Sequence, residues 1–276
     1  MSKLKKIANF NQLPIVIYTM GKVGSRSIVK ELNQNGIEPL DLHWLNYTYH
    51  TKKDLKFLHK KKFKLKAYEV VHNILVKLIF KLQKKQIKVL TIIRDPITVR
   101  HSFLFQDLHL FLYDYFEMNK GTARENSDGD FMKKIMDTYI KENYFVEHLQ
   151  NELFETLEIK EENLNFNKQR GYGFYNNKKF NILMVTLEKL NDNHQLVGDF
   201  LGIPFHAEKS NDSMHKWYNP LKSKFSEEIS YDEGYLRRFY QENRVDLFYT
   251  EEDIETFIAK WKTKETSTIR QKITHQ

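Results

Sequence analysis

Cysteine is absent from this chain of 276 residues, which excludes a disulfide framework and any chemistry that needs a thiol. Proline and glycine are scarce, with 5 and 10 residues, and no Pro-, Gly- or Ser-rich linker or internal repeat divides the sequence. Since 41% of the residues are hydrophobic, the chain can bury a sizeable core. We expect one domain over residues 1–276, with its core at about 12–262 and a weakly ordered tail at 263–276.

Long apolar runs are also missing, because no stretch approaches the roughly 18 residues that a membrane span needs. The start of the chain has basic residues before an apolar run of only about seven residues, which we interpret as a strand rather than a signal peptide. We therefore expect a cytoplasmic protein, with peripheral contact with the inner face of the membrane as the alternative.

Positive charge exceeds negative charge, with 44 Lys and Arg against 36 Asp and Glu and a formal net charge of +8. Much of the surplus lies in residues 52–66 and 77–88. Such runs are typical either of a solvated helix face or of a surface that attracts polyanions: a nucleotide donor, an anionic glycan, nucleic acid or a membrane. Aromatic residues interleave with these lysines, but no nucleic-acid-binding motif accompanies them. No nucleic-acid partner is therefore expected.

The most informative stretch is Pro14–Ile28, with the sequence PIVIYTMGKVGSRSI. Its β-branched and aromatic residues predict a buried strand. Gly21 and Gly24 allow a tight turn, and Ser25 suits the N-cap of a following helix. Backbone amides, the positive end of the helix dipole and Lys22 therefore meet at one point. This arrangement predicts a site for an anion, most simply a phosphate or sulfate.

The glycine turn matches neither of two common nucleotide-binding patterns. A Walker A loop has four residues between its first glycine and its Gly-Lys-Ser/Thr ending, whereas here Lys22 directly follows the first glycine. A dinucleotide fingerprint needs a third glycine, and Gly21 and Gly24 are the only two in the turn. An ordinary tight turn between a strand and a helix remains the alternative interpretation of this motif alone.

A second signal comes from Ile87–Ser102, with the sequence IKVLTIIRDPITVRHS. An apolar strand ends at Arg94, and Asp95-Pro96 suits the cap and first turn of a helix. Ligands of open parallel sheets bind at the carboxyl ends of strands, where Arg94 would lie, and Arg100 and Ser102 can point back to the same edge. An arginine and a hydroxyl there predict a second anion site. The alternative is a helix cap beside a surface ion pair.

The two motifs together resemble the sulfotransferases that use PAPS (3′-phosphoadenosine 5′-phosphosulfate). In that family a Lys-x-Gly-Ser/Thr loop after the first strand holds the 5′-phosphosulfate, and an Arg followed eight residues later by a Ser holds the 3′-phosphate. Arg94 and Ser102 match the second motif. The residues that match the first are Lys22, Val23, Gly24, Ser25, Arg26 and Ser27. Arg26 departs from the pattern, because many members carry a small hydroxyl residue there.

The later part of the chain adds to this resemblance. Ile182–Leu190, followed by Phe200–Phe205, looks like the late strand and helix of the same fold. Met214–Asn219, with the sequence MHKWYN, is similar to a Lys-Trp-Tyr stretch of bacterial sulfotransferase-like proteins of capsular polysaccharide synthesis. The resemblance implies that Lys216 closes over the 3′-phosphate of the donor. The two aromatic residues after it either stack on adenine or on a sugar ring, or anchor the loop.

Alternating strands and helices predict an α/β fold: a P-loop-like parallel sheet with helices on both faces and a helical C-terminal part. The active site is expected where strands one and four end. The expected strands are 14–20, 38–43, 65–71, 87–93 and 181–187, with a tyrosine-rich loop before the last, and the expected helices are 25–35, 52–63, 74–85, 96–118, 130–157, 189–202, 231–243 and 251–261.

An acceptor hydroxyl needs a base to take its proton. Three side chains at expected strand ends qualify, namely His72, Glu69 and His43. His72 is the first choice, because glycan 2-O-sulfotransferases that resemble this pattern place a base histidine at a similar point, although a histidine at a strand end can simply face solvent. Lys22 is expected to stabilise charge on the transferred group. No metal-ligand cluster is evident, so no metal is expected.

The expected function is transfer of the sulfuryl group of PAPS to a hydroxyl of a saccharide, with PAP as the product, by in-line displacement. The acceptor is a carbohydrate, either a polysaccharide, a lipid-linked glycan or something smaller. Two alternatives stay open. A P-loop kinase requires ATP and magnesium, and a basic protein that binds polyanions without catalysis shows salt-sensitive binding and no nucleotide selectivity.

Overall fold

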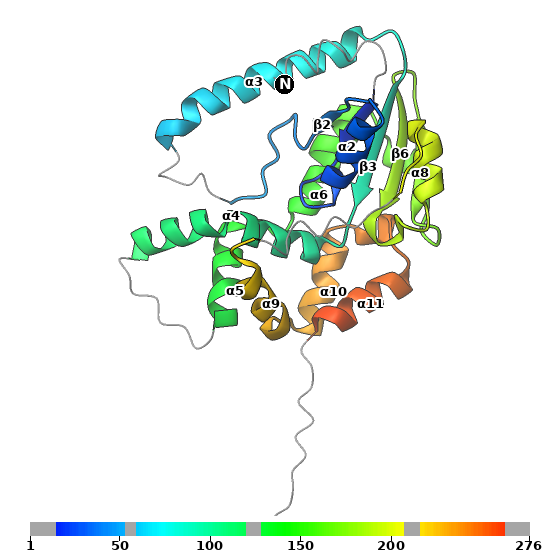
Figure 1. Ribbon diagram of the computed structural model, residues 1–276. Coiled ribbons are helices and arrows are strands. Elements are labelled where there is room, and N and C mark those ends of the chain that lie inside the picture. The colour runs from blue at the N-terminus through cyan, green and yellow to red at the C-terminus, as the bar shows by residue number, and fades with distance from the viewer. Residues whose placement is uncertain (1–14, 53–58, 120–127, 207–215, 263–276) are drawn as a thin grey trace, which may run out of the picture.

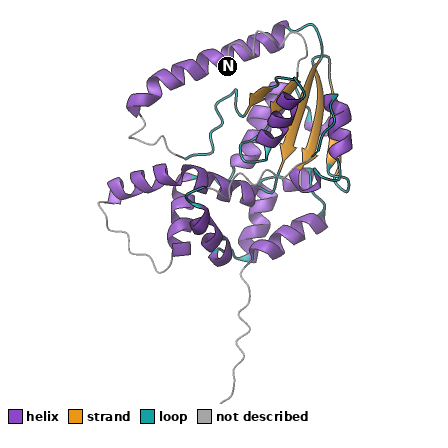
Figure 2. Ribbon diagram, viewed as in Figure 1, coloured by secondary structure: helices purple, strands orange, loops and turns teal. Residues whose placement is uncertain are grey.

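The computed structural model describes residues 15–52, 59–119, 128–206 and 216–262; the expected weakly ordered tail lies outside these ranges. A sheet is flanked by helices, and further helices lie below it (Figure 1, Figure 2). In chain order the elements are β1 (Ile15–Tyr18), α2 (Ser25–Gln34), β2 (Leu40–Leu42), α3 (His59–Leu82), β3 (Ile87–Ile93), α4 (Pro96–Asn119), α5 (Asp128–Tyr139), α6 (Tyr144–His148), the π-helix η2 (Leu149–Phe154), α7 (Glu155–Leu157), the 3-10 helix η3 (Glu161–Asn163), β4 (Asn165–Asn167), β5 (Tyr172–Asn176), β6 (Phe180–Thr186), the 3-10 helix η4 (Leu187–Lys189), α8 (His194–Leu201), α9 (Asn219–Glu228), α10 (Glu233–Glu242), the 3-10 helix η5 (Val245–Leu247) and α11 (Glu251–Trp261).

The α/β fold class is confirmed, but the sheet is mixed rather than parallel throughout. Its strand order is β2-β1-β3-β6-β5-β4. The first four strands pair in parallel, whereas β5 and β4 add an antiparallel hairpin beside β6. This hairpin replaces the expected tyrosine-rich loop. Gly173 permits it, because a Cβ atom there would lie 2.6 Å from the carbonyl oxygen of Asn165 on the paired strand.

Both faces of the sheet are covered. Ile15 pairs with Lys88, so these side chains share one face, whereas Tyr18, three residues after Ile15, points to the other. Lys88 Nζ donates to the carbonyl oxygen of Phe200 in α8 at 2.8 Å. Tyr18 Oη donates to the Glu152 carboxylate in η2 at 2.6 Å. α8 and η2 therefore lie on opposite faces.

The expected strand at 65–71 is wrong, because this segment belongs to the long helix α3. Val70 and Val71, whose branched side chains suggested a strand, are exposed on that helix. A helix rather than an alternating strand is also indicated by the spacing of its buried residues, which are His72, Asn73, Val76 and Phe80. α3 crosses the top of the molecule and projects beyond the sheet (Figure 1).

The expected helix 130–157 is also interrupted. The segment Ile140–Asn143 separates α5 from α6. Here the backbone pairs across the chain instead of continuing the helix: Lys52 N donates to the carbonyl oxygen of Tyr139, and Lys141 N donates to that of His50. Long-range pairing thus overrides a local helical pattern.

The buried apolar residues form one cluster that extends from β1 to Trp261 at the end of α11. Helices α4, α10 and α11 were expected within a residue or two of their observed bounds. Over the part of the chain that the structure describes, we find no helix that combines the length and the apolar character needed to cross a membrane.

Candidate anion-binding site at the carboxyl edge of the sheet

The turn after β1 has the backbone geometry of an open helix N-terminus. Lys22 and Gly24 adopt positive φ angles of 70° and 83°. Helix α2 begins at Ser25, and its N-cap is Gly24, which offers no side-chain cap. The expectation that Ser25 is the N-cap is therefore wrong by one residue, and Ser25 is buried in the first turn. The backbone N–H groups of the first turn of α2 therefore point to the position where the anion is expected.

The two predicted motifs lie side by side, because β1 and β3 are hydrogen-bonded neighbours. Arg94, directly after β3, donates from Nη1 to the carbonyl oxygen of Lys22 at 2.7 Å. Burial lowers the pKa of the Arg94 guanidinium, while Glu188 and Asp95 favour its charged form. The edge predicted to carry Lys22 and Arg94 is therefore the edge where the structure brings them together.

Lys22 lies in a cluster of positive charge. Burial is the largest cause that lowers its pKa to about 8, and repulsion from Lys216 and Arg26 lowers it further. The negative charge of Asp107 raises the pKa of Lys22, and repulsion from Lys222 lowers it. An ammonium group whose charge is disfavoured in this way gains from a bound anion. The cluster thus has the electrostatics of a site for a polyvalent anion.

Lys222 is a member of this cluster that the sequence analysis missed. It lies in the first turn of α9, and its pKa is lowered by burial, then by Arg94 and Lys216. Lys222 therefore connects the Arg94 side of the site to the Lys216 side. The signal in the sequence was available, because Lys222 follows Lys216 by six residues around the Asn219-Pro220 start of a helix.

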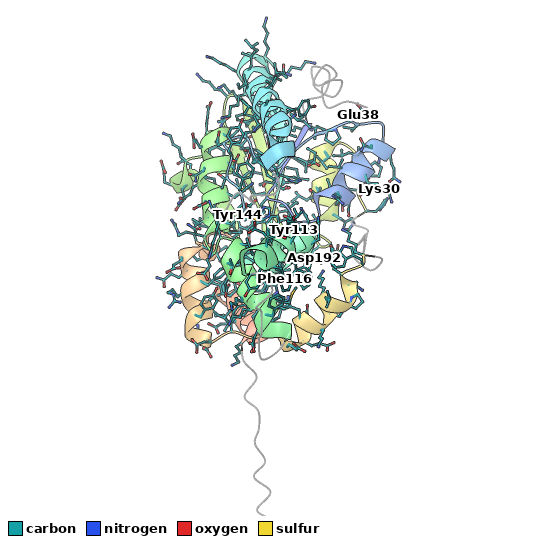
Figure 3. All side chains as sticks on the ribbon, turned by 90° about the vertical axis from the view of Figure 1, so that its left-hand side faces the viewer. Lys30, Glu38, Tyr113, Phe116, Tyr144 and Asp192 are labelled. Atoms are coloured by element: carbon teal, nitrogen blue, oxygen red, sulfur yellow. The ribbon has the colours of Figure 1, made fainter. Side chains whose placement is uncertain are left out.

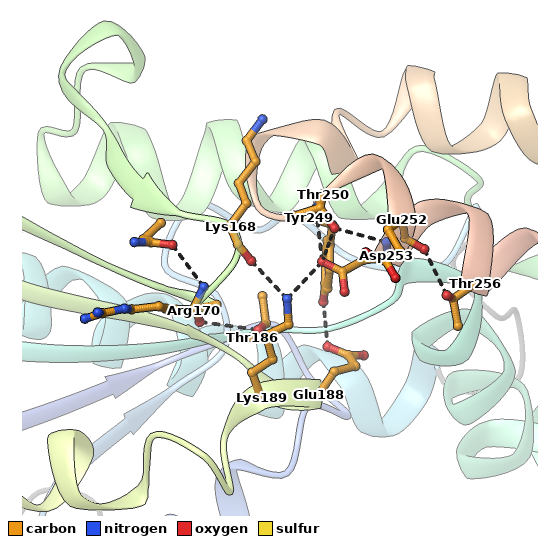
Figure 4. Close-up of polar contacts among 12 residues, drawn as sticks. Lys168, Arg170, Thr186, Glu188, Lys189, Tyr249, Thr250, Glu252, Asp253 and Thr256 are labelled. Atoms are coloured by element: carbon orange, nitrogen blue, oxygen red, sulfur yellow. Dashed lines mark hydrogen bonds and ion pairs between the residues drawn. The ribbon is translucent and has the colours of Figure 1, made fainter.

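A polar network holds the end of β6 beside Arg94. Glu188 accepts a hydrogen bond from Tyr249 Oη at 2.7 Å and one from the backbone N–H of Asp95 at 3.1 Å. Lys189 Nζ pairs with Asp253 at 3.0 Å, next to the capping box of α11 (Figure 4). Burial raises the pKa of Glu188. The network ties α11 to the strand end that faces the anion site.

Asp95 is confirmed as the cap of α4. Its carboxylate accepts from the backbone N–H groups of Ile97 at 3.1 Å and Thr98 at 3.3 Å. It also accepts from Tyr240 Oη at 3.1 Å and from Trp261 Nε1 at 3.0 Å. Asp95 thus joins the cap of α4 to α10 and α11, which explains why it is buried.

Arg100 does not point to the anion site, contrary to the expectation. Its guanidinium donates to Asp137 at 3.1 Å and to Tyr235 Oη at 3.3 Å, toward α5 and α10. Ser102 donates its hydroxyl proton to the carbonyl oxygen of Thr98 at 2.8 Å, within its own helix. The oxygen of Ser102 can still accept a hydrogen bond, but its donor is engaged in this geometry.

The two aromatic residues of the Lys-Trp-Tyr segment differ in their exposure to solvent. Tyr218 is buried, with its ring centroid 5.9 Å from that of Phe105. Trp217 is 62% exposed. Lys216 contributes to the charge around Lys22. The anchoring interpretation therefore holds for Tyr218, and Trp217 is the aromatic ring that is accessible to a ligand.

His43 lies where it was expected, directly after β2 and beside the end of β1. Its Nδ1 is 3.0 Å from the carbonyl oxygen of Thr19. Because a carbonyl only accepts, Nδ1 carries the proton, and Nε2 is the basic nitrogen of the neutral ring. His148 donates from Nε2 to the carbonyl oxygen of His43 at 2.6 Å, and burial lowers its pKa to about 4. His148 is thus a neutral group that supports His43.

His50 is a second candidate residue that the sequence analysis missed. Its Nε2 lies 3.0 Å from Asp107, the carboxylate that acts on Lys22. Its ring stacks on Phe103 with centroids 4.0 Å apart. Phe103 in turn fills the space beside Gly21, where a Cβ atom would lie 3.0 Å from the ring. The His50–Asp107 pair is therefore next to the glycine turn, although 57 residues separate its members, so local sequence spacing could not reveal it.

His72 and Glu69 are not at a strand end, because both belong to α3. His72 is buried, and its Nδ1 lies 3.3 Å from Asn73 Oδ1. Asn73 donates to the carbonyl oxygen of Leu45 at 3.3 Å. The strand-end argument for His72 and Glu69 therefore fails, although α3 does approach the loop after β2.

That loop is held by one buried carboxylate. Glu152 in η2 accepts from the backbone N–H groups of Leu45, Asn46 at 3.0 Å and Thr48 at 2.9 Å, as well as from Tyr18. Burial and the charge of Glu152 raise the pKa of Tyr18 well above its ordinary value. The backbone of this loop is thereby fixed relative to β1.

An open polar pocket of about 530 Å³ lies beside this loop; its lining residues are Asn46, Tyr47, Thr48, Lys77, Lys141, Glu147, Asn151 and Glu155. Of these residues, Tyr47 is aromatic, and its ring centroid lies 6.3 Å from that of Tyr49. Amide, hydroxyl and charged groups beside aromatic rings suit a hydroxyl-rich ligand. Among the residues that the structure describes, no group of three or more His, Asp or Glu side chains is placed to hold a metal ion.

Comparison with protein-family models gives no match. Comparison with curated proteins gives none either, and the same holds for solved structures. The function is therefore argued from this chain's own residues and from the resemblance of its two motifs to the PAPS-dependent sulfotransferases.

Proposed function

We propose that this protein is a PAPS-dependent sulfotransferase that transfers a sulfuryl group to a saccharide hydroxyl. The observation that carries the proposal is the cationic cluster at the carboxyl edge of β1 and β3. Lys22 has its pKa lowered to about 8 by burial and by Lys216, Arg26 and Lys222. Such a cluster is costly without an anion and is stabilised by one. The glycine turn is then of the P-loop-like kind, with its helix N-terminus toward the anion.

PAPS fits this site because it carries two separate anionic groups. The turn Lys22–Ser27 would hold the 5′-phosphosulfate through its amides and Lys22. Arg94, Lys216 and Lys222 would hold the 3′-phosphate. Ser102 would join them only if its hydroxyl turned away from the carbonyl oxygen of Thr98 to donate to the phosphate. The order of the turn does not fit a Walker A lysine, which favours PAPS over ATP as the donor.

The chain's own residues account for the chemistry of the reaction. PAPS supplies the sulfuryl group. Lys22 and the first-turn amides of α2 stabilise negative charge that develops on the transferred group and on the leaving oxygen. Because these donors are fixed by the turn and by Arg94, they need no reorganisation during the reaction. Trp217 offers an exposed ring against which adenine or a sugar can stack.

The proton of the acceptor hydroxyl needs a base, and His50 is the best placed of the candidates. Asp107 orients its ring, as a carboxylate does for a general-base histidine, and Asp107 acts directly on Lys22. His43 is the alternative, since its Nε2 is the basic nitrogen next to the end of β1. His72, the first choice from the sequence, lacks the strand-end position on which that choice rested.

The polar pocket beside the loop 44–49 is the proposed place of the acceptor saccharide. It lies next to the segment that carries His43 and His50, and its amides and hydroxyls can bond sugar hydroxyls. A cytoplasmic location remains part of the proposal.

The proposal is tested by incubating the protein with PAPS and a panel of capsular and lipid-linked glycans, and measuring PAP and sulfated product together. PAP formation that requires a glycan supports the proposal. ADP formation from ATP and magnesium on the same panel supports a kinase instead. Salt-sensitive binding of the glycans with neither product contradicts catalysis and supports a polyanion-binding protein.

A further inference from the structure

Helix α3 has an inner face that attaches it to the rest of the molecule. Val76 and Phe80 are buried, and the Phe80 ring lies edge-on against Phe180 of β6 with centroids 5.5 Å apart. Asn73 donates to the carbonyl oxygen of Leu45. These contacts satisfy one side of the helix, so its other side does not need to be apolar for the fold.

The outer face of α3 is nevertheless apolar. Val71, Ile74, Leu78 and Leu82 are 55%, 58%, 47% and 67% exposed. Their spacing of three, four and four residues places them in one stripe along the helix. A single exposed aliphatic residue is ordinary, but a contiguous stripe of four marks an interaction surface. We call these four residues the outer stripe.

Lysines run along one edge of the outer stripe. Lys77 and Lys81 are exposed and lie four residues apart on one side of α3. Lys77 also donates to Asn46 Oδ1. The exposed Lys84 follows two residues after the helix ends at Leu82. Between Ala67 and Lys85 the sequence contains one acidic residue, Glu69. The surface is therefore both apolar and strongly basic.

The geometry points to a membrane surface containing anionic phospholipids as the partner of this face. Aliphatic side chains of an interfacial helix enter the boundary between headgroups and acyl chains, while lysines beside them contact anionic headgroups. We infer that α3 lies in this interface through the outer stripe and the lysine row. α3 forms the upper border of the molecule in two perpendicular views (Figure 1, Figure 3), so a flat surface can approach it. The inference stands independently of the proposed function.

Other occupants fit the face less well. In a two-fold symmetric pair of antiparallel α3 helices, each lysine row would face the same row of the other copy, and like charges would repel. Residues 1–14 of the chain contain three lysines and no acidic residue, so they do not complement the lysine row. Nucleic acid would contact the lysines but would leave the aliphatic stripe uncovered.

The test is sedimentation of the full chain with vesicles of phosphatidylcholine alone and of phosphatidylcholine mixed with phosphatidylglycerol. Two variants weaken one component each: V71Q/I74Q/L78Q replaces three of the four residues of the outer stripe, and K81E/K84E reverses the charge of two lysines. Glutamine is a good helix former, so α3 should persist. The matched control for the stripe is Y113Q/F116Q/F174Q, which replaces aromatic residues that are 51%, 43% and 40% exposed. The matched control for the lysines is K168E/K178E, which reverses two exposed lysines outside α3. Melting temperatures check that every variant is folded.

We expect the chain to bind the anionic vesicles and not the neutral ones. Both α3 variants should weaken that binding by about tenfold or more, since each lysine near an anionic surface contributes about fivefold, while both controls should bind as the unmodified chain does. Equal binding by folded α3 variants, or no binding to anionic vesicles, would overturn the inference. A dimer in solution that V71Q/I74Q/L78Q dissociates, without vesicle binding, would overturn it in favour of self-association. Binding to duplex DNA that depends on the lysines but not on the stripe would also overturn it.

Discussion

Arg94 donates a 2.7 Å hydrogen bond to the backbone carbonyl oxygen of Lys22. This bond joins the residue after β3 to the glycine turn after β1. An arginine has five N–H donors, so Arg94 can hold the turn with one and still offer others to an anion. Substitution of Arg94 would therefore disturb both the turn and the ligand contacts. Substitutions of the lysines and histidines of the site separate ligand contacts from the geometry of the turn better than a substitution of Arg94 does.

The lowered pKa of Lys22 predicts proton uptake on anion binding. In the free protein this pKa is about 8, so at pH 8 about half of the molecules carry a neutral Lys22. A bound anion raises the pKa, and the protein must then take up a fraction of one proton. The phosphates of PAP have already lost their protons at this pH. Affinity for PAP should fall as the pH rises from 7 to 9.

Calorimetric titration at pH 8 in buffers of different ionisation enthalpy measures this uptake. Lys22→Arg should bind PAP without it, because a guanidinium stays charged. If Lys22→Arg takes up the same number of protons, another group titrates and Lys22 does not contact the anion.

Lys222 is predicted to bind the donor, although the sequence motifs do not include it. Lys222→Ala should weaken PAP binding by about tenfold or more, as expected for loss of a charged contact. Lys224→Ala is the matched control. Lys224 lies two residues after Lys222 on α9, its side chain is 54% exposed, and its Nζ is 3.8 Å from Glu228. Equal affinities of the two variants would remove Lys222 from the site.

The base is predicted to be His50. His50→Gln should lower kcat by about 100-fold or more, because general-base catalysis contributes about 10²–10⁴, while its affinity for PAP stays within about twofold. His43→Gln and His72→Gln provide the comparison under the same assay. A loss confined to His43→Gln would transfer the role to His43, and a loss confined to His72→Gln would restore the choice made from the sequence.

Glu152 is predicted to stabilise the fold through the loop after β2. Glu152→Ala removes the acceptor of three backbone N–H groups and of Tyr18, and should lower the free energy of unfolding by about 3–5 kcal/mol. The neighbouring exposed residue Glu155 is the control, where Glu155→Ala should change it by about 0.5 kcal/mol or less. Urea denaturation compares the two. Similar midpoints would show that the loop does not depend on this carboxylate.

The sequence predicted the parts of the fold that are determined locally. Apolar runs located β1, β3 and β6, and Asp95-Pro96 located the start of α4. The two anion motifs were placed at strand ends, and the structure brings Lys22 and Arg94 into contact there. These predictions depended on residues adjacent in the chain, for which propensity and capping are informative.

Features that depend on distant contacts were missed. The branched residues Val70 and Val71 suggested a strand, but they lie on the exposed side of α3, where no core packing selects them. The His50–Asp107 pair joins a loop to α4, and no local pattern encodes it. Glu152 looks like an ordinary helical residue in the sequence, yet it is fully buried because three backbone amides converge on it. Tertiary context decided each of these cases.

The central claim is tested most directly by calorimetric titration of the chain with PAP and, separately, with ATP and magnesium. Lys22→Ala is the test variant, and Lys30→Ala is its control, because Lys30 is exposed on the same helix that follows the turn (Figure 3). We predict tight binding of PAP in preference to ATP, lost by about tenfold or more in Lys22→Ala and retained in Lys30→Ala. Equal binding of PAP and ATP, or equal binding by the two variants, would contradict the assignment of a PAPS site.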